Sequence, residues 1–192
     1  LMKDVNIEVE SGQTVAIVGP TGAGKTTLMN LLLRFYDVKG GAIKIDGVDI
    51  RDMKREDLRS LFSLVLQDTW LFSGSIYDNI RYGRLDARKD EIISAAKMAN
   101  VHHYIRTLTK GYDSLINEEA NNISQGEKQL LTIARAILKD PQILILDEAT
   151  SSVDTRLERR LQEAMHRVMQ GRTSFVIAHR LSTIRDADMI LV

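Results

Sequence analysis

The chain has 192 residues, of which 44% are hydrophobic, and its 26 Lys and Arg residues balance 26 Asp and Glu residues. That length is enough for one sizeable core, or for a core with a small satellite subdomain. Zero net charge offers no general attraction for nucleic acid, the lack of cysteine excludes disulfides and thiol-bound metals, and no apolar run approaches the roughly 20 residues of a membrane-spanning helix.

Strands and helices alternate in the first third of the sequence. The hydrophobic pattern predicts, in order, strands at 7–10 and 13–18 joined at Ser11-Gly12, a helix at 26–35, and strands at 41–46 and 62–66. The run of mixed charge from 51 to 59 is typical of the solvated face of a helix. The first strands favour an antiparallel portion near the N-terminus.

The middle of the chain carries helical spacing without strands, and strands return after it. Helices are predicted at 75–80, 88–100 and 101–108, then strands at 143–146, 173–178 and 189–192 with a helix at 154–169. This order predicts an α/β fold with a mostly parallel sheet and an inserted α-helical subdomain. We expect one domain over 1–192, with its core at about 1–72 and 141–192 and the helical subdomain at about 73–140.

A glycine-rich segment lies between the strand at 13–18 and the helix at 26–35. It reads Gly19-Pro20-Thr21-Gly22-Ala23-Gly24-Lys25-Thr26 and fits G-x-x-x-x-G-K-[ST], in which backbone N–H groups surround phosphates. A plain turn would explain the glycines but not a lysine at a helix N-terminus, where the dipole disfavours positive charge. The segment therefore predicts a site for a nucleotide triphosphate.

Two carboxylates, Asp147 and Glu148, end a later apolar strand. Alone they could be the polar end of a buried strand, but a phosphate loop in the same chain favours a role in metal binding and catalysis. The adjacent pair His102-His103 cannot share one helix face, and we expect these residues at the surface and not in a metal site.

A third segment, 121–129, precedes another helix. Ser124 followed by Glu127 fits a capping box, and apolar residues from 130 to 138 supply a buried face. Capping does not explain Gly126 in the first turn, where glycine costs about 1 kcal/mol relative to alanine. A capped helix start with free N–H groups can bind an anion, so this segment is a second candidate phosphate site.

Taken together, these motifs resemble the nucleotide-binding domain of ABC (ATP-binding cassette) transporters over nearly the whole chain. The usual family signature is L-S-G-G-Q, and this chain differs from it at Ile123, Gln125 and Glu127. The stretch 65–80 and the acidic pair Glu118-Glu119 resemble the exporter branch, which includes multidrug and lipid exporters. The ordered motifs are the phosphate loop, Gln67, Ile123 to Glu127, Asp147-Glu148, Ser151 to Asp154, and His179.

The resemblance implies a P-loop NTPase (RecA-like) core and a role for each motif residue. Backbone groups from Gly22 to Thr27 would surround the phosphates of ATP, and Lys25 would span the β- and γ-phosphates. Thr26, Gln67 and Asp147 would hold Mg²⁺. Glu148 would polarise the attacking water, and His179 would contact the γ-phosphate. Ser124 and Gly126 would touch the γ-phosphate of the ATP held between two nucleotide-binding domains, and Asp154 would be a further nucleotide-binding residue.

The resemblance also implies partners. ATP would be held between two nucleotide-binding domains, identical or not, and a transmembrane domain of the same or another polypeptide would carry an unknown substrate. The domain would then lie on the cytoplasmic face of a membrane. The chain looks like a fragment that lacks an N-terminal strand, with its adenine-stacking residue, and the C-terminal end. Trp70, Leu71, Phe72 and Tyr77 could be core residues or could line a groove for a partner helix.

Two other classes of protein fit the sequence less well. A soluble ABC-type ATPase of DNA repair or translation would act on nucleic acid, but the zero net charge and the lack of long coiled-coil heptads disfavour it. A regulatory module that binds nucleotide without turnover is disfavoured by Glu148 and His179. The sequence therefore predicts the ATP-hydrolysing motor domain of an exporter.

Overall fold

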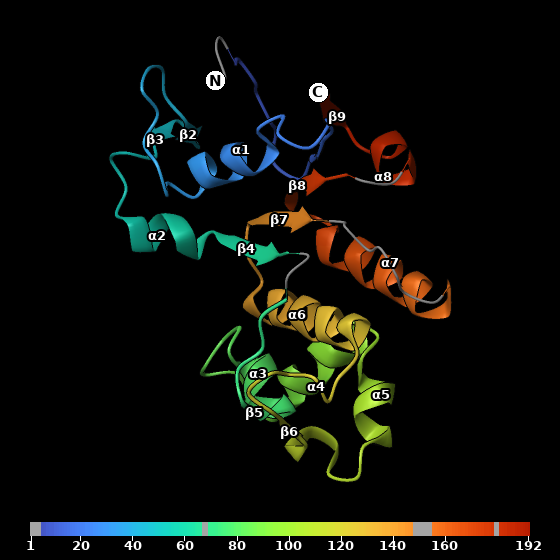
Figure 1. Ribbon diagram of the computed structural model, residues 1–192. Coiled ribbons are helices and arrows are strands. Elements are labelled where there is room, and N and C mark those ends of the chain that lie inside the picture. Colours follow the sequence, from blue (N-terminus) through green and yellow to red (C-terminus); the bar gives the residue numbers. More distant parts are fainter. Residues whose placement is uncertain (1–4, 67–68, 148–154, 179–180) are drawn as a thin grey trace. The chain divides into compact units, whose positions relative to one another are not determined.

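The computed structural model describes residues 5–66, 69–147, 155–178 and 181–192. These residues form two compact units (Figure 1). The first comprises residues 1–64, 141–148 and 172–192, and the second comprises residues 65–140 and 149–171. The helix that the sequence placed in the core, at 154–169, groups with the second unit, and that unit begins at residue 65, earlier than the expected 73.

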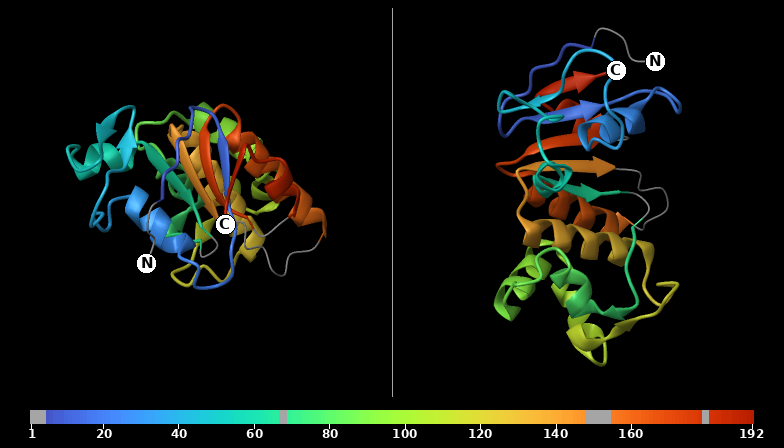
Figure 2. Two further views of the ribbon diagram at one scale, coloured as in Figure 1. Left: turned by 90° about the horizontal axis from the view of Figure 1, so that it is seen from above. Right: turned by 90° about the vertical axis from the view of Figure 1, so that its left-hand side faces the viewer.

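The first unit is built on a five-stranded sheet with the order β4-β7-β8-β1-β9. β1 pairs in parallel with β8 and with β9, and β7 pairs in parallel with β8 (Figure 2). All three central residues of β7, Leu144 to Leu146, are fully buried, as expected for a strand covered on both faces. The strands are β1 Thr14–Ile17, β4 Phe62–Val65, β7 Ile143–Asp147, β8 Thr173–Ile177 and β9 Met189–Leu191.

Two helices and a small hairpin pack with this sheet. They are α1 Lys25–Leu32, α2 Arg55–Ser60, and the antiparallel strands β2 Lys44–Ile45 and β3 Val48–Asp49. Met29 and Leu33 from α1 and its end, and Leu58 from α2, pack into one core with sheet residues such as Ile17 and Ile145. Helix α1, which begins at the glycine-rich segment, is thereby fixed against the sheet.

Arg34 ties the end of α1 to the segment before α2. Its guanidinium donates to the carbonyl oxygens of Ile50 at 3.0 Å and Met53 at 2.9 Å, and it forms an ion pair with Asp37 at 3.0 Å. Because Arg34 has a positive φ of 52°, the chain reverses direction there. The end of α1 is therefore joined by hydrogen bonds to the segment before α2.

The strand expected at 7–10 is not formed: these residues join no sheet in the part of the chain that the structure describes. The amide of Gln13 donates to the carbonyl of Glu10 across a turn in which Gly12 has φ 86°. Ile7 and Val9 do alternate with polar residues, but a strand also needs a neighbour, and β2 and β3 pair with each other. In the described part of this unit, the antiparallel portion is this hairpin alone.

The second unit is mainly helical, as expected, and α6 is central to it. Helix α6 contacts α3, α4 and α7. The helices of this unit are α3 Ile76–Arg81, α4 Lys89–Met98, α5 His102–Thr107, the short 3-10 helix η1 Gly111–Asp113, α6 Gln125–Lys139 and α7 Thr155–Met169. A two-stranded antiparallel ladder, β5 Gly74–Ser75 with β6 Leu115–Ile116, and helix α8 Leu181–Arg185 of the first unit were not predicted. Among the described residues, no helix has the length and apolar character needed to cross a bilayer.

Candidate functional site

The glycine-rich segment forms a tight loop between β1 and α1 in the first unit. Gly19, Gly22 and Gly24 have φ values of 152°, 88° and 98°, a region in which side chains are strained. A Cβ on Gly19 would also lie 3.0 Å from the Cβ of Ala23. The amide of Ala23 donates to the carbonyl of Pro20 at 3.1 Å and closes the loop. Glycine is thus required at these positions by backbone geometry.

Helix α1 begins at this loop with its N-terminus open. Gly24 is the N-cap in the left-handed conformation, without a side-chain cap, and the first turn contains no acidic residue. The first N–H groups of a helix have no intrahelical acceptor, and the dipole places partial positive charge there. Thr26 and Thr27 are exposed in this first turn. This end of α1 is suited to an anion with several oxygen atoms.

Lys25 brings a positive charge to the same loop. Its half-buried ammonium donates to the carbonyl oxygens of Gly19 at 2.6 Å and Pro20 at 3.0 Å. These bonds hold the side chain back along the loop instead of letting it extend into solvent. The cation, the glycine turns and the helix start therefore converge on one place.

Asp147 is positioned by the sheet. In the parallel register, Asp147 of β7 lies opposite Ile177 of β8, and Ile177 lies opposite Ile17 of β1. Asp147 therefore ends its strand level with the start of the glycine-rich loop, two strands away, or about 10 Å at the usual strand spacing. A carboxylate at the carboxyl ends of parallel strands is in the usual place for ligand chemistry in such sheets.

The second candidate phosphate segment lies at the start of α6, in the second unit. Ser124 is the N-cap, and its hydroxyl oxygen accepts from the amide of Glu127 at 3.3 Å. The capping role expected for Ser124 is confirmed. Gly126 is buried in the first turn, which places the backbone of α6 close to its neighbours.

Four of the predicted site residues, Gln67, Glu148, Asp154 and His179, lie outside the described residues. Of the others, Gly19 to Thr27 form one continuous loop and helix start, and Asp147 joins them at the same edge of the sheet. Ser124 and Gly126 come together at a separate helix start.

Two of the residues that the sequence left ambiguous, Trp70 and Phe72, form an aromatic cluster with Tyr82, which was not singled out by sequence. The rings of Trp70, Phe72 and Tyr82 lie 5.7–6.3 Å apart, and Arg135 stacks within 6.0 Å of all three. Trp70 is 63% exposed and Tyr82 58% exposed, whereas Leu71 is buried. The stretch is thus partly core and partly surface. Arg135, in the middle of an apolar helix, was not singled out by sequence, although a charge on a buried face is a usable signal.

A family model described as "ABC transporter" matches residues 2–151, well over half of the chain. The chain belongs to the ABC transporter family. In this family the ATP-binding domain hydrolyses ATP to power transport, and this chain is such an ATPase domain with a P-loop NTPase fold.

Individual relatives of this ABC domain are exporters or fused permeases by name. It is 59% identical over 192 residues to the fatty acid ABC transporter ATP-binding/permease protein of Mycobacterium tuberculosis, covering 100% of the chain and 30% of that protein. It is 53% identical over 188 residues to the beta-(1→2)glucan export ATP-binding/permease protein of Brucella melitensis, and this match covers 98% of the chain and 31% of that protein. The chain therefore spans about a third of the length of these curated relatives.

A solved structure supports the same fold. A bacterial Atm1-family ABC exporter with ATP bound matches with a TM-score of 0.88 and 48% identity, over 97% of this chain and 32% of that one. The expected family and fold class are thus confirmed.

Proposed function

We propose that this chain is the ATP-hydrolysing motor of an ABC exporter and that it drives an unknown substrate across a membrane. The observation that supports this most directly is the loop at Gly19–Lys25, where positive-φ glycines, an open helix start and a lysine meet at the carboxyl edge of a parallel sheet. Hydrolysis of a phosphate anhydride depends mainly on positioning and on stabilising negative charge. Each of these features serves one of those two needs.

The roles of the chain's own residues follow from their chemistry. Amides from Gly22 to Thr27 donate to the phosphate oxygens, and the ammonium of Lys25 leaves its two carbonyl acceptors for the β- and γ-phosphates. Glu148 acts as the general base toward water, a role worth about 10²- to 10⁴-fold in rate. His179 and Gln67 contact the γ-phosphate and the water. These assignments rest on motif position, because Glu148, His179 and Gln67 are not among the described residues.

The donor set fits Mg²⁺ bound together with a nucleotide. The described residues contain no group of three or more acidic or imidazole ligands. Mg²⁺ usually takes one or two carboxylates, a hydroxyl and phosphate oxygens, so a full protein cage is not needed. Thr26, Asp147 and Gln67 would hold it. When bound, the metal neutralises charge on the phosphates and fixes their orientation.

We further propose that two such domains close on two ATP molecules. The start of α6 combines a serine cap and a buried glycine with the N-terminal amides of a helix, which suit an anion, yet it lies on a different unit from the chain's own phosphate loop. Ser124, Gly126 and Asp154 would serve the ATP of a second, identical or paralogous domain. The names of the relatives, ATP-binding/permease proteins, favour a transmembrane domain in the same polypeptide. We propose that the chain lies at the cytoplasmic face of that membrane.

The test uses the complete polypeptide that carries this chain, purified in detergent and reconstituted. Ser124→Ala should leave ATP binding to a single, undimerised nucleotide-binding domain nearly intact while lowering ATP turnover. Glu148→Gln should still bind ATP, but it should stop turnover and accumulate the dimer. An equal loss of ATP binding and turnover in Ser124→Ala would contradict the two-domain site. Unchanged turnover in Glu148→Gln would remove Glu148 from its role.

A further inference from the structure

The start of α6 carries a charge that works against its proposed ligand. Glu127 lies in the first turn of α6, three residues after the N-cap Ser124. A carboxylate there is favourable for the helix because it offsets the positive end of the dipole. The same offset weakens the attraction of that helix start for phosphate. A helix start that binds ATP therefore needs something to neutralise Glu127.

Arg160 of α7 is placed to do this. A guanidinium nitrogen of Arg160 lies 3.8 Å from a carboxylate oxygen of Glu127, with the two side chains only 31% and 13% exposed. Helices α6 and α7 contact each other in the second unit. The charge of Glu127 is also felt by Tyr104 of α5, where burial and then Glu127 raise the pKa of the phenol. Tyr104 therefore stays neutral and cannot neutralise the carboxylate.

The Arg160 side chain is itself held in place. Its other terminal nitrogen donates to the main-chain carbonyl of Asn100 at 2.6 Å. Asn100 has φ 57°, its side-chain amide donates to Glu163 at 3.0 Å, and its side-chain oxygen accepts from Arg167 at 2.7 Å. These bonds fix the turn between α4 and α5 to α7, and they orient the side chain of Arg160 toward α6.

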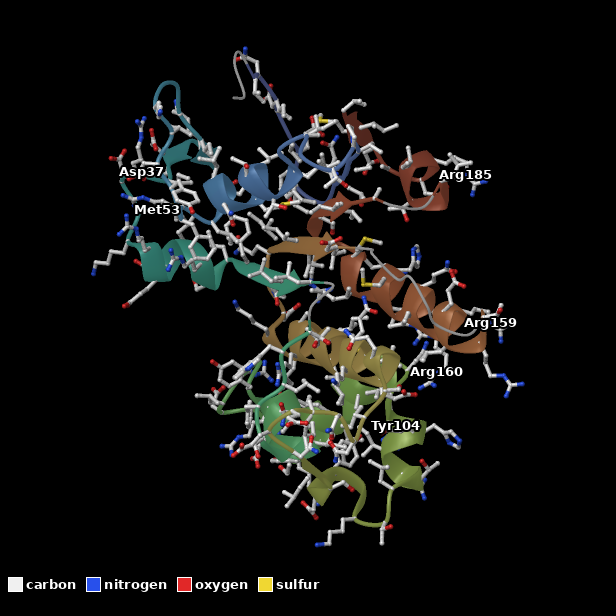
Figure 3. The ribbon with its side chains drawn as sticks, in the orientation of Figure 1. Asp37, Met53, Tyr104, Arg159, Arg160 and Arg185 are labelled. Atoms are coloured by element: carbon white, nitrogen blue, oxygen red, sulfur yellow. The ribbon has the colours of Figure 1, made fainter. Side chains whose placement is uncertain are left out.

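Arg159, the preceding residue of α7, provides a comparison because its side chain is mostly exposed to solvent. It pairs with Glu163, one turn along α7, at the same distance of 3.8 Å, but the two side chains are 77% and 49% exposed, so solvent screens this pair far more than that of Arg160 with Glu127. Figure 3 shows Arg159 toward the outer side of α7, and Arg160 on the side where Tyr104 of α5 lies. The two neighbours therefore form a matched pair for an experiment.

We propose that Arg160 is a positioning residue for the ATP-contacting start of α6. Its guanidinium neutralises the carboxylate of Glu127, and Ser124 and Gly126 can then bind the phosphate of the ATP held by the second domain. The proposal rests on the proposed function of that helix start. Arg160 touches neither ATP nor the reacting atoms. It also gives a physical reason why glutamate is tolerated where the signature usually has glutamine.

A double-mutant cycle on the complete polypeptide tests this. Arg160→Met keeps the length and apolar stem of the side chain but removes its charge. It should raise the KM for ATP about 3- to 5-fold, the upper part of the range of a partly exposed ion pair, with a smaller change in kcat. In the Glu127→Gln background the same substitution should change KM less than about twofold, because no charge is left to neutralise. Arg160→Lys should restore most of the loss, and Arg159→Met should match the wild type.

The outcomes separate the two proposals. An equal rise of KM for Arg160→Met in the wild-type and Glu127→Gln backgrounds would show that Arg160 acts only through Asn100 and would overturn the inference. A wild-type KM for Arg160→Met in a protein with normal turnover would also overturn it. If the wild type turns over ATP but Ser124→Ala has no effect, the proposed role of the α6 start fails first, whatever Arg160 does.

Discussion

The guanidinium of Arg135 donates to both the side-chain oxygen and the main-chain oxygen of Asn79, joining α6 to α3. Asn79 is fully buried, and its amide also bonds to the carbonyls of Phe72 and Ser75 at 3.0 Å. Arg135 donates a further bond to the carbonyl of Trp70 at 2.7 Å. The loop that carries the exposed aromatic rings is therefore shaped by two polar residues beneath it.

Replacing Arg135 should destabilise the second unit. Burial lowers the pKa of Arg135 to about 10, so the side chain remains charged at neutral pH and its bonds to Asn79 are charge-assisted. Arg135→Met would remove the charged donor from both oxygens of the buried Asn79 and leave the side-chain oxygen with only the amide of Phe72 at 3.2 Å, and we expect a loss of about 2 to 4 kcal/mol in the free energy of unfolding. Arg106→Met, at an exposed position of α5, should cost less than about 0.5 kcal/mol.

Urea unfolding followed by far-UV circular dichroism measures this difference. Trp70 fluorescence provides a second readout, because the ring stacks near Arg135 and should become more mobile in the variant. An Arg135→Met variant as stable as Arg106→Met, with unchanged fluorescence, would show that the Arg135 bonds are not needed for the loop.

Gly83 should not tolerate a side chain. A Cβ at Gly83 would clash with the main-chain carbonyl group of Arg135 in α6, which cannot move without breaking the helix. Gly83→Ala should therefore lower the stability by about 1 to 3 kcal/mol, as other overpacking substitutions do. Gly40→Ala is the matched control, since its Cβ would meet no atom within 4 Å, and it should be within about 0.5 kcal/mol of the wild type.

Thermal melting of the two alanine variants side by side decides this prediction. Gly83 directly follows the C-cap of α3, but it is not among the glycines with positive φ, so backbone conformation alone predicts no loss on substitution by alanine. Equal melting temperatures for Gly83→Ala and Gly40→Ala would mean that α3 and α6 can separate at this contact without cost.

The fold could be predicted from the sequence where the residues of a single helix or strand contain the whole pattern that defines it. β7 is a continuous apolar run and appears close to its expected bounds, and α6 begins directly after the serine cap that the sequence indicated. Residues 7–10 show the opposite case, because their alternation was read correctly but their missing neighbour is a property of the tertiary structure. The short ladder of β5 with β6 joins residues about 40 positions apart and has no local signal.

The candidate site divides in the same way. The loop from Gly19 to Lys25 is a local motif whose glycines are required by backbone geometry, so sequence spacing located it. Arg135 bonds to Asn79, 56 positions away in the chain, and the side chain of Arg160 is held by the carbonyl of Asn100, 60 positions away. On the sequence alone they are ordinary arginines on helices, and only packing shows what they support.

Lys25 should be needed for turnover and not for folding. Its two bonds are to carbonyls of an exposed loop, and loss of such bonds costs little stability. A missing charge at the terminal phosphates should lower kcat at least about 100-fold, as for other preorganised donors. We expect Lys25→Met to melt with the wild type while losing ATP turnover, and Lys44→Met, exposed on β2, to change neither. Retained ATP turnover in Lys25→Met would show that the terminal phosphates of ATP bind at another place.

His102 and His103 differ more than the sequence suggested. His103 is exposed, as expected, but His102 is half-buried, and its Nδ1 lies 2.7 Å from the hydroxyl oxygen of Tyr112. Burial, followed by the charges of Lys97 and Arg106, lowers the pKa of His102. Burial also raises the pKa of Tyr112 to about 12, so the phenol stays protonated and can donate to a neutral imidazole.

This difference predicts an acid-sensitive contribution to stability. Because the pKa of His102 is lower in the folded than in the unfolded chain, the folded state binds fewer protons, and its stability is full above about pH 6.5 and falls as the pH drops toward the lowered value. The effect should be below about 1 kcal/mol, since solvent screens a half-buried ring. His102→Gln should remove part of the loss of urea midpoint between about pH 7.5 and pH 5.5, whereas His103→Gln should leave that loss as in the wild type. Identical pH dependence in both variants would show that the contact with Tyr112 does not distinguish the two protonation states.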